Sequence, residues 1–236
     1  MIWTGRVWQP DERHSAIDKI RLSCRVVAAT INDEQMARKL CSQRTITAVE
    51  KLARTDPRIA ETGNVWDRGP MILNTPAGII DLATGELKSH DAALLHTRIA
   101  GASPQGSCPR WLRFLQEVTG GNQDLVDYLQ RVAGYCLTGS MSEQVFFFLH
   151  GTGANGKSIF ISTLSEVLGD YAATAPLDTF TSANSERHPT DLAGLATARA
   201  VFVTETEHGK PWAESRIKAI TGGDTLRVRF LYLNSP

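Results

Sequence analysis

Apolar positions recur at helical spacing through the early part of the chain. From about Ser15 to Ala53, leucines, isoleucines and valines return among spaced arginines and lysines, as they do on the buried face of an amphipathic helix. The preceding segment, Ile2 to Trp8, carries Gly5 between two short apolar stretches, which is typical of the tip of a small hairpin. The pattern therefore predicts a hairpin followed by helices.

Short runs with the character of strands come next. Met71–Thr75 and Ile79–Leu82 are rich in apolar residues and flank the turn-forming Pro76–Gly78, and Thr84–Gly85 marks a further turn. Runs of this length between turn residues are typical of antiparallel strands. We expect strand, turn and strand here.

Small residues and prolines gather in Gly101–Pro109, and such a stretch between patterned segments predicts a domain boundary. Trp111–Leu137 then resumes as two helices broken at Gly120–Gly121, because paired glycines end a helix. We expect a smaller accessory domain of helices and a β-hairpin over residues 1–105, and a second domain over residues 106–236.

The most informative pattern in the chain is an apolar run, a glycine-rich loop and a helical repeat, in that order. Val145–Leu149 is unbroken and apolar, as a central parallel strand requires. From Ile159 onward apolar residues recur at helical spacing until Gly169 ends the repeat. The eight loop residues between them are Gly151, Thr152, Gly153, Ala154, Asn155, Gly156, Lys157 and Ser158.

This loop fits the phosphate-binding pattern G-x-x-x-x-G-K-[S/T]. Triphosphate oxygens need several backbone N–H groups that converge on them, and glycines let a tight loop turn its amides inward. Lys157 can then contact the β- and γ-phosphates, and the Ser158 hydroxyl can ligate the Mg²⁺ that bridges them. The pattern predicts an ATP-type site in an α/β, P-loop NTPase core, with Lys157 in a catalytic role.

One alternative uses the same glycines. Gly151, Gly153 and Gly156 also match the G-x-G-x-x-G pattern of dinucleotide-binding folds, and Asp170 lies near the distance of a ribose-binding acid. In those folds the acid ends a second apolar strand, whereas Asp170 directly follows the helix-ending Gly169. The triphosphate interpretation is therefore preferred.

Hydrolysis also needs an acid at the end of a neighbouring strand. Val201–Thr204 is a short apolar strand candidate, and Glu205 follows it directly. We expect Glu205 to hold Mg²⁺ together with Ser158, and Glu207 to act as the general base or as a second metal contact. Ordinary surface acids remain the alternative.

Basic residues near the carboxyl end form a candidate DNA contact. Lys218 precedes the turn Thr221–Asp224, and apolar and basic residues alternate from Leu226 to Phe230. Alternation places Arg227 and Arg229 on one face of a strand, where they could follow a phosphodiester backbone. An amphipathic edge strand whose charges resist aggregation is the alternative.

Composition excludes several classes. Lysine plus arginine and aspartate plus glutamate both number 25, so no global charge favours nucleic acid. No apolar stretch reaches the length of a membrane span and no leader pattern begins the chain, which predicts a cytoplasmic protein without membrane contact. Four cysteines lack metal spacing and are expected to be buried thiols: Cys24, Cys41, Cys108 and Cys136.

Taken together, the ordered motifs resemble the superfamily 3 helicase module of phage and plasmid primase-helicases, including the pox-virus-type replicative NTPases. Five stretches carry the resemblance in order: the loop, Gly169–Tyr171, His188–Ala193, Glu205–Glu207, and Lys218 with Thr221–Asp224. Upstream, Leu73–Pro76, Thr84–Leu87 and Gly134–Gly139 are similar to the accessory domain that precedes the helicase in that family.

The resemblance implies an AAA+-like core in a homo-hexameric ring that hydrolyses ATP with Mg²⁺ and moves single-stranded DNA through its centre during DNA replication. Lys218, Arg227 and Arg229 would then face the DNA channel. Family members continue to a sensor strand and an arginine that reaches the neighbouring subunit, whereas this sequence ends at Pro236. We therefore expect an incomplete helicase domain.

Two other functions stay open. A chain without the sensor and the arginine finger could be a catalytically deficient fragment that binds nucleotide or DNA. A small-molecule kinase could use the same loop, but Glu205–Glu207 and the arginine-bearing hairpin argue against it.

Overall fold

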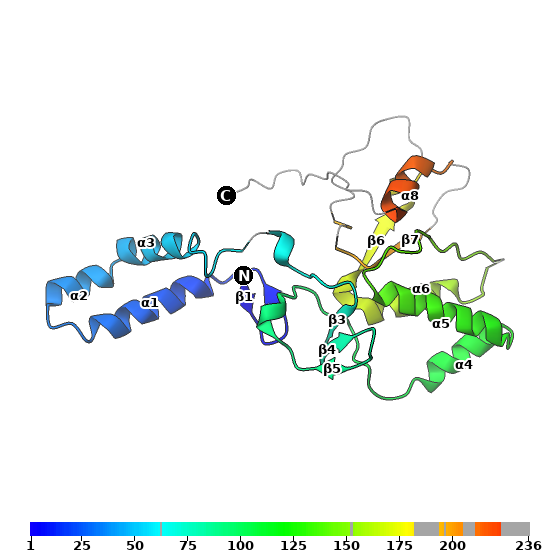
Figure 1. The fold of residues 1–236 in the computed structure, drawn as a ribbon, viewed down its shortest axis with the longest axis horizontal. Coiled ribbons are helices and arrows are strands. Elements are labelled where there is room, and N and C mark those ends of the chain that lie inside the picture. Colours follow the sequence, from blue (N-terminus) through cyan, green and yellow to red (C-terminus); the bar gives the residue numbers. More distant parts are fainter. Residues whose placement is uncertain (62, 152, 182–193, 196, 205–210, 223–236) are drawn as a thin grey trace. The chain divides into compact units, whose positions relative to one another are not determined.

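A computed structural model describes the chain except for residues 62, 152, 182–193, 196, 205–210 and 223–236. The described residues form a mixed α/β structure, as expected, with two compact units (Figure 1). One unit comprises Met1–Arg68 and Asp91–Thr97, and the other comprises Gly69–His90 and Arg98–Pro236. The functional division into residues 1–105 and 106–236 remains a prediction, because compactness is a different criterion from function.

The first unit opens with the predicted hairpin. Strand β1 (Ile2–Trp3) pairs antiparallel with β2 (Trp8–Gln9), so that Trp3 lies opposite Trp8 with their ring centres 5.8 Å apart. Trp8 also meets Trp66 edge-on at 6.0 Å. Aromatic pairs of this kind stabilise a short hairpin that has few backbone hydrogen bonds.

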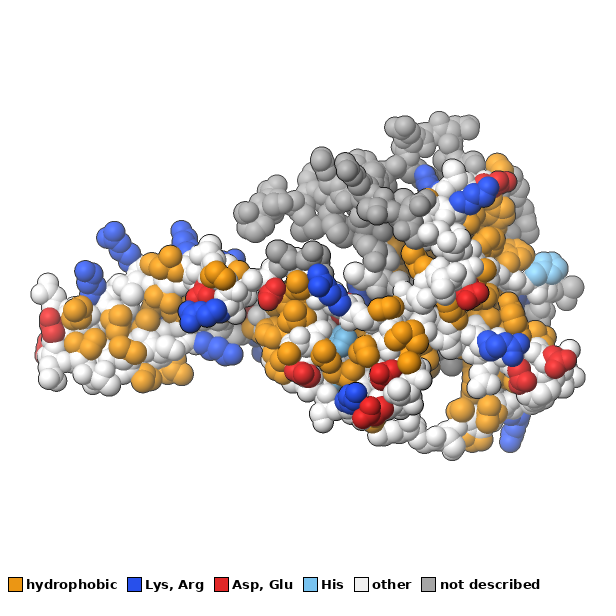
Figure 2. Space-filling model, viewed as in Figure 1, with side chains coloured by type: hydrophobic (Ala, Val, Ile, Leu, Met, Phe, Trp, Pro, Cys, Tyr) orange, Lys and Arg blue, Asp and Glu red, His pale blue; other side chains and the backbone are white. Residues whose placement is uncertain are grey.

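Three helices follow, and together they span the predicted range: α1 (Ser15–Ala28), α2 (Glu34–Leu40) and α3 (Gln43–Ala53). Side chains begin two of them, because Asp33 accepts from the first-turn amides of α2 and Ser42 from that of Thr45 in α3. Cys24 and Ile46 are buried inside the unit. On the outside, Figure 2 shows apolar and basic side chains intermixed over these helices. Leu22 of α1 is 63% exposed.

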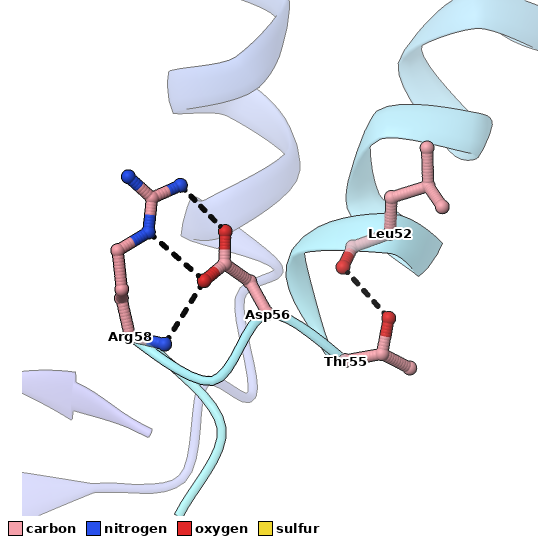
Figure 3. Close-up of polar contacts among 4 residues, drawn as sticks. All are labelled: Leu52, Thr55, Asp56 and Arg58. Carbon is pink, nitrogen blue, oxygen red and sulfur yellow. Dashed lines mark hydrogen bonds and ion pairs between the residues drawn. The ribbon is translucent and has the colours of Figure 1, made fainter.

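Polar contacts hold the chain where α3 ends (Figure 3). The hydroxyl of Thr55 donates to the carbonyl of Leu52 at 3.0 Å. The carboxylate of Asp56 accepts from Nε, Nη2 and the backbone N–H of Arg58 at 3.0, 2.7 and 2.9 Å. The guanidinium of Arg58, and then its amide, lower the pKa of Asp56, and the carboxylate raises the pKa of Arg58.

The second unit contains the predicted strand, turn and strand. Strands β3 (Ile72–Thr75), β4 (Gly78–Asp81) and β5 (Leu87–Lys88) form an antiparallel sheet in that order. Gly78 begins β4 at φ +149°, and a Cβ there would lie 2.3 Å from the carbonyl oxygen of Lys88. Only glycine allows this close approach between two strands.

Three further helices pack around an apolar cluster. They are α4 (Pro109–Val118), α5 (Gln123–Leu137) and α6 (Lys157–Leu168). Gly120 and Gly121 adopt positive φ between α4 and α5, which confirms the predicted break. Leu115, Val126 and Phe160 are buried where the helices meet, and the ring of Trp111 stacks on that of Phe160 at 5.7 Å.

A parallel pair of strands forms the rest of the framework. Strand β6 (Ala172–Pro176) pairs with β7 (Ala200–Thr204), with Ala172 opposite Ala200. The 3₁₀ turns η3 (Gly169–Tyr171) and η4 (Leu177–Thr179) flank β6, and α8 (Glu214–Thr221) follows β7 (Figure 1). A second apolar cluster, which includes Leu73, Leu168 and Tyr171, joins the antiparallel sheet to the end of α6. Strand β7 confirms the strand predicted directly before Glu205.

The strand predicted at residues 145–149 is wrong for this structure, because these residues form no strand. Their side chains alternate only from Phe146 onward, because Val145 is also exposed. Leu149 packs against the cluster between α4, α5 and α6, whereas Phe146 and Phe148 are 58% and 65% exposed. An apolar run indicates burial but does not specify a hydrogen-bonded neighbour.

The cysteine prediction is half wrong. Cys24 is buried and Cys136 is partly buried, but Cys41 and Cys108 are exposed. The exposed pair lies at helix ends, Cys41 at the end of α2 and Cys108 just before α4, where backbone groups face water. Within the described residues, none of the helices combines the length and the apolar character that crossing a bilayer requires.

Candidate functional site

The glycine-rich loop leads directly into α6. Gly156 is the amino-terminal cap of that helix at φ +80°, and Lys157 is its first residue. The carbonyl oxygen of Gly156 accepts from Phe160 at 2.9 Å, which closes the first helical turn. The amino terminus of a helix carries unpaired N–H groups and a partial positive charge, both of which favour a bound anion.

Left-handed backbone conformations curve the loop. Gly153, Ala154 and Gly156 have φ values of +97°, +48° and +80°. Glycine takes this conformation without strain, whereas alanine pays a steric cost for it. A loop with several left-handed residues can turn successive amides toward one point, which is the geometry that phosphate oxygens need.

A side chain at either of two glycines would collide with a neighbouring side chain. A Cβ on Gly156 would lie 2.5 Å from Cγ1 of Val118 and 2.9 Å from Cε2 of Phe114. A Cβ on Gly151 would lie 1.8 Å from the amide nitrogen of Asn155. Helix α4 therefore packs closely against the loop at Gly156, and the side chain of Asn155 packs closely against Gly151.

The lysine of the motif is partly buried and held within the loop. Its Nζ donates to the side-chain oxygen of Asn155 at 2.6 Å and to the carbonyl of Gly151 at 3.2 Å. Ser158, the next residue, is exposed. The loop therefore offers the residue types that a triphosphate with its Mg²⁺ would need, namely an ammonium at the helix start and a hydroxyl open to solvent.

Other predicted site residues lie outside the described part of the chain, namely Thr152, Glu205, Glu207, Arg227 and Arg229. Strand β7 ends at Thr204, directly before Glu205 in the sequence. The described residues contain no cluster of three or more metal-ligating side chains. The predicted partnership of Ser158 with Glu205 on a metal stays a prediction.

Lys218 lies on α8, with a side chain that is 80% exposed. Its ammonium is 3.8 Å from the carboxylate of Glu214, one turn earlier on the same helix. An exposed pair of this type is weak, so the lysine is accessible to an anionic partner.

The position of Asp170 argues against the dinucleotide-binding alternative. Asp170 lies in the turn η3 and does not end a strand. Its carboxylate accepts from the backbone N–H of Ile99 at 3.1 Å, and its own N–H donates to the carbonyl of that residue. Asp170 therefore anchors the chain between the antiparallel sheet and β6.

Sequence reasoning missed Arg199, which directly precedes β7. Its guanidinium donates to the carbonyls of Leu137 and Ile72, each at 2.5 Å, and stacks on the ring of Tyr171. These contacts fix the start of the strand that leads to Glu205. No motif marks them, because the partners are backbone carbonyls 62 and 127 residues away in the sequence.

Parts of the chain are similar to known proteins, two of which are a putative helicase and an uncharacterized mitochondrial protein. It is 32% identical over 114 residues to a protein of Acanthamoeba polyphaga mimivirus named "Putative helicase L207/L206", covering 47% of this chain and 12% of that protein. It is 35% identical over 65 residues to the "Uncharacterized mitochondrial protein ymf21" of Marchantia polymorpha, covering 28% of this chain and 36% of that protein. The chain thus matches a small part of each relative's length.

A family model covers the amino-terminal half, including the hairpin, helices α1 to α4 and the antiparallel sheet. Its match spans residues 1–120, ends just after α4 and stops short of the glycine-rich loop. On this match, the chain belongs to the family described as D5 N terminal like.

Proposed function

We propose that this chain is the ATP-binding module of a DNA replication helicase, in which ATP hydrolysis drives movement along single-stranded DNA. The observation that carries the proposal is the loop before α6, with three left-handed residues and Lys157 held at the helix start. The family and the mimivirus relative, whose name says helicase, support the helicase class.

The loop and the two acids that follow β7 would have different roles in the proposed site. Backbone amides from Gly151 to Ser158 would surround the phosphates, and Lys157 would contact their outer oxygens. Ser158 and Glu205 would hold Mg²⁺, and Glu207 would orient or deprotonate the attacking water. ATP with Mg²⁺ supplies the phosphoryl group and neutralises its developing charge.

DNA contact is proposed for the basic residues after β7. Lys218 is exposed on α8, and the alternation from Leu226 to Phe230 in the sequence pairs Arg227 with Arg229 on one strand face. Positive side chains in such an arrangement follow the backbone of a single strand. A homo-hexameric ring would bring six such elements to a common channel.

Nucleotide binding is the first test. The chain is titrated with a fluorescent ATP analogue in the presence of Mg²⁺. The Lys157→Ala variant should lose at least tenfold in affinity, because it removes a charge-assisted hydrogen bond to phosphate. Lys88→Ala is the matched control, since Lys88 is an exposed lysine of β5 paired with Glu86. Equal binding by the wild type and Lys157→Ala would refute the site.

Turnover is the second test. ATP hydrolysis is measured with and without single-stranded DNA, for the wild type and for Arg227→Ala combined with Arg229→Ala. We expect DNA to stimulate the wild type, and the double variant to bind ATP without stimulation. Binding with no turnover would favour a catalytically deficient module, and stimulation by a small metabolite in place of DNA would favour a kinase.

A further inference from the structure

Lys157 is engaged by acceptors of its own loop. An ammonium group has three N–H donors, and two of them are directed to Asn155 Oδ1 at 2.6 Å and to Gly151 O at 3.2 Å. A contact at the β-phosphate and another at the γ-phosphate need two donors. At least one of the two loop contacts must therefore open when a triphosphate binds.

The side chain of Asn155 crosses the loop. Its amide nitrogen lies 1.8 Å from where a Cβ of Gly151 would be, and that same point is 3.3 Å from Nζ of Lys157. The amide thus fills the inner curve between the two ends of the loop, and both Asn155 and Lys157 are partly buried there. Gly151 is required for this arrangement, because any larger residue would displace the amide.

The two loop contacts differ in how easily they open. Gly151 O belongs to the backbone and moves only with the loop, whereas the Asn155 amide can rotate about its side-chain bonds. A phosphate oxygen is a stronger acceptor for an ammonium than a neutral amide oxygen, because both partners are then charged. Asn155 is therefore the contact that gives way.

We propose that Asn155 is a positioning residue that holds Lys157 in the nucleotide-free loop and releases it to the phosphates, thereby lowering the affinity of the site for nucleotide. This inference rests on the proposed function of the loop. A contact that stabilises only the empty state opposes ligand binding by its own free energy. The amide sets how tightly nucleotide is held, which matters for a site that must release its product.

Two substitutions in the full chain test the role, with affinity for ATP and ADP measured by titration. Asn155→Ala removes the competing acceptor and should tighten binding about tenfold or more, which is at the low end for a hydrogen bond to a charged group. Asn155→Asp should weaken binding about tenfold or more, because a carboxylate pairs with Lys157 and repels phosphate. Asn122→Ala is the control, since that amide caps α5 through Leu125.

A second measurement is independent of nucleotide. Hydrogen exchange of the loop amides in the nucleotide-free protein should be faster in Asn155→Ala than in the wild type, and unchanged in Asn122→Ala. Failure of the wild type to bind ATP would refute the proposed function, and loop exchange would still decide the contact. Weaker ATP binding by Asn155→Ala, with Asn155→Asp no worse, would overturn the inference, since Asn155 would then contact the nucleotide itself.

Discussion

Arg199 stacks on Tyr171 at the start of the parallel sheet, with its guanidinium carbon 4.4 Å from the ring centre. The two residues directly precede β7 and β6, and the N–H of Arg199 donates to the carbonyl of Tyr171 at 2.8 Å. The hydroxyl of Tyr171, a residue that is 1% exposed, accepts from the N–H of Asn74 in β3 at 3.2 Å. The pair thus joins the antiparallel sheet to the starts of β6 and β7.

Replacing Arg199 should weaken this junction. Arg199→Lys keeps the charge but cannot serve two carbonyls and the ring of Tyr171 together, so the free energy of unfolding should fall by about 2 kcal/mol. Arg216→Lys is a matched control, because Arg216 also donates to a backbone carbonyl, that of Thr179, at 2.7 Å. Urea denaturation measures both. Equal losses in the two variants would contradict a special role for Arg199.

Local signals in the sequence predict most of the helices and the hairpins. The helical pattern from Ser15 to Ala53 corresponds to helices with those same outer limits, because repeated apolar spacing and side-chain caps act over short distances. Gly169 ends α6 as predicted. In both cases the decisive interactions lie within a few residues of each other.

Structural features that depend on partners distant in the sequence cannot be predicted from local patterns. The apolar run at 145–149 predicts a strand, but strand formation needs a hydrogen-bonded neighbour that the run itself does not specify. No sequence pattern distinguishes Arg199 from the other arginines, because its partners come from distant segments. In the candidate site, the motif identifies Lys157 but not the acceptor, Asn155, that holds it.

Gly156 should not tolerate a side chain. Gly156→Ala places a Cβ 2.5 Å from Val118 and demands a positive φ from alanine, so the free energy of unfolding should fall by about 1–3 kcal/mol. Gly85→Ala is the control, because Gly85 has φ +76° but no atom within 4 Å of the added Cβ. Val118→Ala should restore part of the loss in Gly156→Ala. A Gly156→Ala loss no larger than that of Gly85→Ala would show that packing against α4 is unimportant.

The cysteines should react in an order set by exposure. Burial raises the pKa of Cys136, so less of it is thiolate at any given pH and its alkylation should need a higher pH than that of a free thiol. The exposed Cys41 and Cys108 should react first. Timed alkylation followed by peptide mass spectrometry measures each site. Modification of Cys136 as fast as Cys108 would contradict the packing around α5.

Acid should loosen the start of α1. The carboxylate of Asp11 accepts from the N–H groups of Ala16 and Ser15, each at 2.8 Å, and these bonds lower the pKa of Asp11, the bond from Ala16 most. A lowered pKa means that the contribution to helix stability is complete above the usual range of an aspartate and is lost as the pH falls through the lowered value. The amide chemical shifts of Ser15 and Ala16 should therefore titrate together, below that usual range. Asp11→Asn, which keeps one acceptor without the charge, should abolish the titration. Shifts that stay constant with pH, or that titrate at the ordinary value, would show that the carboxylate does not cap the helix.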